Sequence, residues 1–181
     1  MSTLSAAAGT WDIDAAHTNL GFSARHAMVA KVRGHFAEYT GSFTIDGDDI
    51  SKSSAELTIQ TGSILTGQAD RDGHLKSPDF LDVESFPTLT FVSTQVAPVS
   101  QSDWKVTGDL TIHGVTKSVV LDVEFAGVET DPWNNTKAGF SATAEIDRED
   151  FGLSWNQPLA GGGVLVGKKV KIELEIETLA S

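Results

Sequence analysis

A chain of 181 residues suits a single domain and is long enough to bury a sizeable core without metal or disulfide staples. Its formal net charge of -12 argues against nucleic-acid partners and anionic membrane surfaces, because both are bound through Lys and Arg. The absence of cysteine excludes disulfides, thiolate nucleophiles and Cys-ligated metals.

The first ten residues are small or uncharged, and they predict a flexible tail over residues 1–10. They contain no Lys or Arg and no apolar run long enough for a signal sequence. No segment of the chain supplies the ~20 consecutive apolar residues of a membrane-spanning helix. We therefore expect a cytoplasmic protein without stable membrane insertion.

Alternating apolar and polar residues predict β-strands along nearly the whole chain. In the segment 104–125, apolar residues at every second position flank the two turn residues His113 and Gly114, which is the pattern of a β-hairpin. The phase of the pattern changes between Phe36 and Tyr39, where a bulge is expected. The predicted strands, in chain order, span residues 11–14, 18–26, 32–45, 55–59, 89–96, the hairpin 104–125, 137–147 and 170–176.

Residues 67–87 depart from this pattern. Gly67 to Ser77 is polar enough to form a short surface helix or lid. The segment that follows lies between two prolines and holds Phe80, Leu81 and Phe86. So much apolar area in a loop implies that the loop folds over something.

One-sided strands must gather around a shared apolar interior. A sheet of roughly eight antiparallel strands commonly closes on itself, which hides its edges and leaves an interior wide enough for side chains or one small ligand. The sequence therefore predicts an all-β, antiparallel barrel with one or two short helices, favoured over a β-sandwich.

Three polar residues are candidates for contacting a ligand. His26 shares a strand face with Leu20 and Phe22 and could donate a hydrogen bond to a head group; a rim histidine bonded to backbone is an equal alternative. Arg71 and His74 would share a helix face and could close over an anionic or carbonyl head. The acidic neighbours of Arg71 favour a structural ion pair at that residue.

Other polar groups are interpreted without a site. Arg148 lies among acidic residues at positions 147, 149 and 150, which favours a structural ion pair still more strongly. The histidines form no HExxH or paired-helix motif, so no metal site is predicted. No nucleophile motif occurs, so no catalytic residue is predicted either.

Four blocks of residues, in order along the chain, resemble the YceI-like family of polyisoprenoid-binding, lipocalin-like proteins, and the likeness covers residues 11–178. The blocks are Trp11, Asp12, Ile13, Asp14, His17, Thr18, Phe22 and His26; Arg71, Asp72, His74, Leu75, Phe80, Phe86, Pro87 and Phe91; Gly108, Leu110, Thr111, Ile112, His113, Gly114, Val115, Thr116 and Lys117; and Arg148, Phe151 and Gly152.

The resemblance implies a lipocalin-like barrel that holds a long isoprenoid-type chain in an apolar tunnel, usually as a homodimer. It implies binding of a polyprenyl chain or isoprenoid quinone by a carrier, storage or sequestering protein, with no cofactor besides the bound lipid. Two alternatives stay open. One is an enzyme acting on a small apolar substrate through His26 with Arg71 or His74, and the other is an interaction module whose barrel is a solid core.

The predicted ligand-binding residues are inward apolar side chains together with the three polar candidates. They are Leu20, Phe22, His26, Phe36, Phe43, Leu57, Ile59, Arg71, His74, Phe80, Phe86, Phe91, Trp104, Val106, Leu110, Leu121, Val123, Phe140, Phe151 and Trp155. This prediction requires the strands to enclose a vacant tube instead of meeting in a filled centre.

Overall fold

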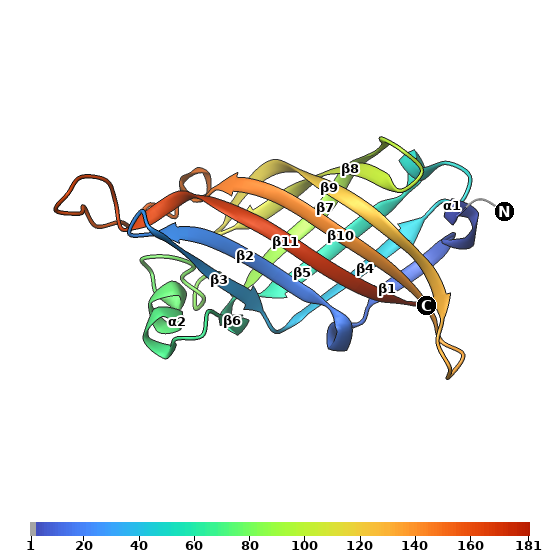
Figure 1. The fold of residues 1–181 in the computed structure, drawn as a ribbon, viewed down its shortest axis with the longest axis horizontal. Coiled ribbons are helices and arrows are strands. Elements are labelled where there is room, and N and C mark those ends of the chain that lie inside the picture. Colours follow the sequence, from blue (N-terminus) through green and yellow to red (C-terminus); the bar gives the residue numbers. More distant parts are fainter. Residues whose placement is uncertain (1–2) are drawn as a thin grey trace.

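The alternating segments form eleven strands in the computed structural model, which describes residues 3–181 (Figure 1). The strands are β1 (Gly9–Ile13), β2 (Asn19–His26), β3 (Ala30–Phe36), β4 (Tyr39–Ile45), β5 (Ser54–Gln60), β6 (Ile64–Leu65), β7 (Thr88–Pro98), β8 (Asp103–Ile112), β9 (Val115–Thr130), β10 (Thr136–Asp147) and β11 (Val166–Ala180). The α-helices are α1 (Thr3–Ala6) and α2 (Ala69–Lys76), and the 3-10 helices are η1 (Ala15–His17), η2 (Ile50–Lys52), η3 (Thr61–Ser63) and η4 (Arg148–Phe151).

The strands form one closed antiparallel barrel. β2 continues the course of β1, β4 that of β3 and β6 that of β5, because β1 pairs with β4, β2 with β3, and β3 with β6. If β1 with β2, β3 with β4 and β5 with β6 are each counted as one interrupted strand, the described chain has eight strands. Each of the eight pairs with its neighbours in sequence. β11 closes the ring by pairing with both β2 and β1. The predicted eight-stranded barrel with few short helices is confirmed.

Local sequence explains the turns and the interruptions. β8 and β9 pair from Ile112 and Val115 outward, around His113 and Gly114 with φ angles of 54° and 73°. Positive φ at both central residues is the requirement of the tight hairpin turn whose twist matches the strands. The expected irregularity after Phe36 is also present, since the predicted strand 32–45 is divided there into β3 and β4.

The N-terminal segment differs from the prediction. Residues 3–10 are not an irregular tail: they form α1 and the start of β1. Ala7 is fully buried, and its carbonyl oxygen accepts a hydrogen bond of 2.7 Å from Nε1 of the buried Trp11. A buried indole N–H needs such an acceptor, which explains why the segment packs against the barrel. Residues 1 and 2 of the predicted tail lie outside the described residues.

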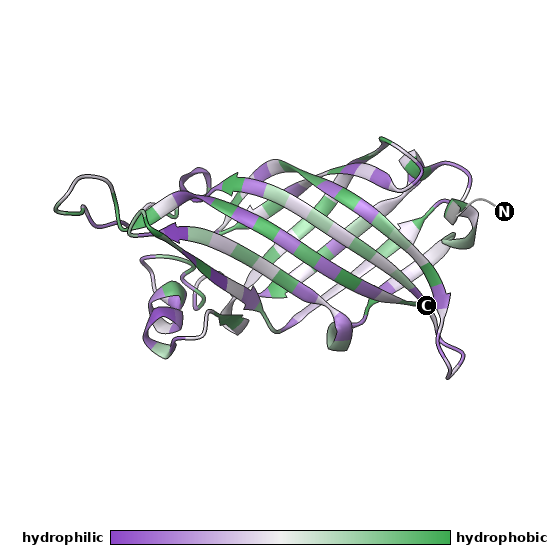
Figure 2. Cartoon of the chain, in the orientation of Figure 1, coloured by the Kyte–Doolittle hydropathy of each residue, from purple (hydrophilic) through white to green (hydrophobic). Residues whose placement is uncertain are grey.

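The inner faces of the strands carry the apolar residues, and hydropathy alternates along each long strand (Figure 2). At the end of the barrel that carries both termini, large aromatic rings fill the interior. The ring centroids of Trp104 and Phe125 lie 5.3 Å apart, and the Phe140 ring lies 5.4 Å from both Phe125 and Phe43. We call this aromatic cluster the filled end.

None of the helices within residues 3–181 combines the length and the apolar content needed to cross a bilayer.

Candidate functional site

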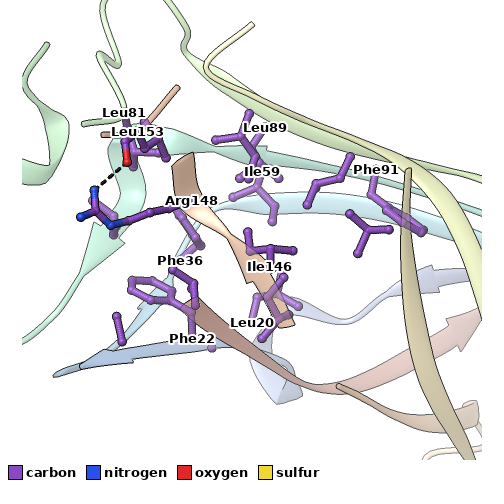
Figure 3. Close-up of a pocket in the computed structure, with 18 of the residues that line it drawn as sticks. Leu20, Phe22, Phe36, Ile59, Leu81, Leu89, Phe91, Ile146, Arg148 and Leu153 are labelled. Atoms are coloured by element: carbon purple, nitrogen blue, oxygen red, sulfur yellow. Dashed lines mark hydrogen bonds between the residues drawn. The ribbon is translucent and has the colours of Figure 1, made fainter. Parts of the chain in front are cut away.

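The other end of the barrel, beside α2, contains an apolar cavity of about 210 Å³ (Figure 3). Its walls are mainly Leu, Ile, Val and Phe side chains of β2, β3 and β5 to β11, and Figure 3 shows Ile59 on one side of it and Leu20 and Ile146 together on another. An engineered protein cavity of about 150 Å³ holds one benzene molecule, so this one has room for roughly eight or nine carbon atoms. We call this part of the barrel the hollow end.

Nine of the predicted ligand-binding residues lie in the cavity wall. They are Leu20, Phe22, Phe36, Leu57, Ile59, Phe80, Phe91, Leu110 and Leu121. All but Phe80 come from strands whose alternation gave the correct inward face. Their contact with a ligand stays a prediction.

Five predicted residues lie outside the wall because they belong to the filled end or its border. They are Phe43, Trp104, Val106, Val123 and Phe140. The inward face was predicted correctly for them, but the space in front of them is occupied by aromatic rings. The expected vacant tube is therefore vacant along only part of its length.

The remaining six predicted residues also lie outside the cavity wall. His26 is exposed at the last position of β2, beyond the cavity. Phe86 packs against the β8–β9 turn, with its ring centroid 4.7 Å from that of His113. Phe151, in η4, is 1% exposed and belongs to the solid core.

α2 and the loop that follows it lie over the cavity, and we call them the cover. Arg71 and His74 of α2, together with Trp155, lie on its side away from the cavity. Nε and Nη2 of Arg71 donate hydrogen bonds of 2.7 Å to the hydroxyl and carbonyl oxygens of Thr66, so the predicted ion pair with an acidic neighbour is replaced by a contact within the chain turn. The His74 ring lies 4.6 Å from the Trp155 ring, and its Nε2 lies 2.9 Å from a carboxylate oxygen of Asp79.

The inner side of this cover is apolar. Leu75 of α2 and Phe80 and Leu81 of the following loop line the cavity, and the His74 ring packs on the Phe80 ring at 5.0 Å. The prediction that this apolar loop folds over something is confirmed. α2 and the loop after it are not part of the hydrogen-bonded sheet, and segments outside a sheet generally open more readily than its strands.

Several wall residues were missed by the prediction. Val170, Ile172 and Leu174 of β11 line the cavity, and their clean alternation with Lys and Glu is a signal that could have identified them. Leu153, in an irregular segment after η4, had no such signal.

Arg148 is the one charged residue in the described wall, and its predicted ion pair with an acidic neighbour is wrong. Its side chain turns inward and is 4% exposed. The neighbouring carboxylates turn outward instead, so that Asp147 lies 3.9 Å from Lys169 Nζ and Glu149 lies 3.4 Å from Lys168 Nζ. Burial lowers the pKa of the Arg148 guanidinium, because desolvation disfavours its charged form.

A separate polar cluster lies at the opposite end of the barrel. Ligand atoms of Asp14, His17 and Glu177 lie within 4.8 Å of one another. The Lys137 ammonium lies 2.7 Å from Glu177 Oε1, so this cluster already contains a cation. The hydrogen bond from His17 lowers the pKa of Asp14 against the opposing effect of burial, and smaller lowering contributions come from the Ala16 backbone N–H and from the charges of His17 and Lys137.

A family model described as the YceI-like domain matches residues 11–178. The UPF0312 protein SAS2572 of Staphylococcus aureus (strain MSSA476) is 42% identical over 165 residues, which cover 91% of this chain and 94% of that protein. The structure of BcnA from Burkholderia cenocepacia is similar with a TM-score of 0.80 at 23% identity, over 91% of this chain and 98% of that one. A polyisoprenoid binding domain from Saccharophagus degradans, implicated in plant cell wall breakdown, gives a TM-score of 0.73 at 15% identity, over 94% and 98% of the two chains. The structural likenesses concern the fold, and the sequence match adds the ancestry: this chain belongs to the YceI-like family.

Proposed function

We propose that this protein binds the apolar chain of an isoprenoid-type lipid, a polyprenyl chain or an isoprenoid quinone, in the cavity at the hollow end. The observation that carries the proposal is a cavity inside a closed barrel with a wall that is apolar apart from one cation. The description of the Saccharophagus degradans domain as polyisoprenoid binding supports the class of ligand. Carrier, storage and sequestering roles all follow from such binding.

The size of the cavity bears on how a long chain is held. A chain segment that fits the cavity would bury on the order of 250 Å², which is worth about 6 kcal/mol at ~25 cal/mol per Å². Association costs about 4 to 15 kcal/mol, so this burial alone gives weak binding at best. A long isoprenoid therefore needs more enclosed length, and we propose that α2 and the loop after it move outward to provide it.

The alternative that this protein is an enzyme depended on three polar residues that could act on a substrate in the cavity. His26, Arg71 and His74 lie outside the cavity wall, and the latter two have partners within the cover. An acid or electrostatic group must lie within hydrogen-bond reach of the reacting atoms. Binding without chemistry is the function that this geometry favours.

A pair of neighbouring substitutions tests the proposal. Leu121→Trp places a large ring in the cavity, whereas Val120→Trp places the same ring on the outer face of β9, where Val120 is 47% exposed. Native mass spectrometry of delipidated protein incubated with a long-chain isoprenoid quinone should show lipid bound to the wild type and to Val120→Trp. Leu121→Trp should lower the occupancy at least ~10-fold, since no free space of chain width remains. A wild-type protein that takes up no isoprenoid lipid would refute the proposal.

A further inference from the structure

Arg148 places a positive charge beside a cavity that otherwise offers only hydrocarbon. We propose that the cavity selects amphiphiles whose polar end is an anion, a carboxylate or a phosphate, and that Arg148 binds this end. The inference rests on the proposed lipid-binding function and specifies the head group.

The charge of Arg148 has no direct counterion. Within residues 3–181, no carboxylate oxygen lies within 4.0 Å of its guanidinium nitrogens. Its acidic neighbours in the sequence, Asp147 and Glu149, are engaged with Lys169 and Lys168 on the outer surface. A buried charge whose direct partners are all neutral carbonyl groups is incompletely compensated, so an anion placed beside it would be bound more strongly than a neutral group of the same shape.

The hydrogen bonds of Arg148 leave donors free. Nε donates to the carbonyl oxygen of Gly167 at 2.9 Å, Nη1 to that of Leu153 at 2.6 Å, and Nη2 to that of Val166 at 3.2 Å. A guanidinium has five N–H groups, two of them on each terminal nitrogen. One N–H on Nη1 and one on Nη2 thus have no acceptor among the described residues, and a guanidinium can offer such a pair to the two oxygens of a carboxylate or phosphate.

The side chain is held ready for this contact. Figure 3 shows Arg148 extending along the cavity wall toward Leu153, where its hydrogen bond is drawn. The three carbonyl acceptors fix the guanidinium plane, and the Phe80 ring lies 5.9 Å from its central carbon. Neutral carbonyls and a ring face stabilise a cation only partly, so an anionic head that reached the guanidinium from the cavity would add stabilisation.

The experiment compares ligands that share one short isoprenoid chain and differ only at the head. Isothermal titration calorimetry at neutral pH would use geranic acid, geranyl phosphate and methyl geranate, since their chain is close to the size that the cavity holds. We expect the wild type to bind both anions at least ~10-fold more tightly than the ester, as for a hydrogen bond to a charged group. The two anionic arms distinguish a carboxylate ligand from a phosphate ligand.

Two variants assign the effect to this residue. Arg148→Met approximately keeps the length of the side chain and removes the charge. The affinities of this variant for the two anions should therefore fall to within ~3-fold of its affinity for the ester. Arg71→Met is the matched control, because Arg71 contacts Thr66 outside the cavity wall and should leave the preference for anions unchanged.

The outcomes separate this inference from the proposed function. Equal affinity of the wild type for acid, phosphate and ester would overturn the role of Arg148 while leaving lipid binding in place. Binding of none of the three by the wild type would overturn both. If Arg148→Met does not fold, as judged by its thermal melting, Arg148→Lys replaces it: this variant keeps the charge but loses the paired N–H groups, so its preference for the anions should fall at least ~3-fold, and an unchanged preference would overturn the role of Arg148.

Discussion

The two ends of the barrel are built from the same strands, yet one is solid and the other is hollow. Along β9, Phe125 stacks on Trp104 at the filled end, whereas Val119 and Leu121 line the cavity only a few residues earlier. The strand face and the alternation are the same in both places. What differs is the size of the side chains, because Trp and Phe reach the barrel axis and Leu, Ile and Val do not.

Gly108 lies where these two regions meet. A Cβ atom at this position would come within 2.3 Å of the Phe91 ring and 2.7 Å of the carbonyl oxygen of Val92. The absence of a side chain therefore lets Phe91 lie flat against β8 on the cavity side. The boundary between the filled end and the hollow end therefore depends on the contact between Gly108 and Phe91 as well as on the aromatic cluster.

The largest expected effect compares two phenylalanines of equal burial. Phe140 at the filled end is 6% exposed and Phe91 in the cavity wall is 7% exposed. Phe140→Ala should lower the free energy of unfolding by about 3 to 5 kcal/mol, because it opens a void among rings that cannot close it. Phe91→Ala should cost at least ~1 kcal/mol less, since one side of its ring already faces empty space. Urea denaturation of delipidated protein measures both values, and equal losses would contradict the distinction between the ends.

A smaller effect is expected from two glycines. Gly108→Ala should destabilise the protein by about 1 to 3 kcal/mol, the usual cost of overpacking, because the Phe91 ring must shift. Gly73→Ala in α2 is the matched control, since a Cβ there meets nothing within 4 Å. That change should stabilise the protein by about 0.4 to 1 kcal/mol through the entropy of the unfolded chain. The same denaturation curves would show it, and a loss of stability in Gly73→Ala would mean that the cover is less regular than described.

The smallest effect concerns pH and the filled end. The folded-state pKa of Asp14 lies below its ordinary value of 3.8, mainly because of the hydrogen bond from His17. A depressed carboxyl pKa stabilises the fold above the unfolded-state pKa, and this contribution is lost as the pH falls through the folded-state value. Asp14→Asn should therefore lower stability by less than about 1 kcal/mol near neutral pH, and the deficit should shrink below pH ~4. Lipid affinity at neutral pH should be unchanged, and a reduced affinity would contradict the separation of this cluster from the cavity.

The sequence predicts the barrel well because alternation reports directly on which face of a strand is buried. The hairpin around His113 and Gly114, the break after Phe36 and the helix within residues 67–77 were all readable from local residue types. In the structure, neighbouring strands follow one another in sequence, because short connections join antiparallel neighbours. The N-terminal segment was misread, since its small residues show no alternation and the burial of Ala7 depends on contacts with the rest of the core.

The position of the cavity was not readable in the same way. Leu121 and Val123 share a face two residues apart, yet only Leu121 lines the cavity. Distinguishing them requires the register that sets Val123 opposite Trp104. Arg148 is a similar case, because its acidic neighbours suggest the surface while its acceptors include Val166 and Gly167, distant in sequence. Long-range pairing decides such contacts, and a local pattern does not contain it.

The aromatic cluster also constrains how cargo could travel. Because rings from several strands block the passage along the barrel axis, a lipid chain cannot thread in at one side and emerge at the other. If α2 and the loop after it move outward as proposed, loading and release would have to share that one route, so a donor and an acceptor could be served only in turn. A protein of this kind would have to leave the donor before it delivers its lipid to the acceptor. The rate of lipid exchange would then be limited by how often α2 and the loop after it open.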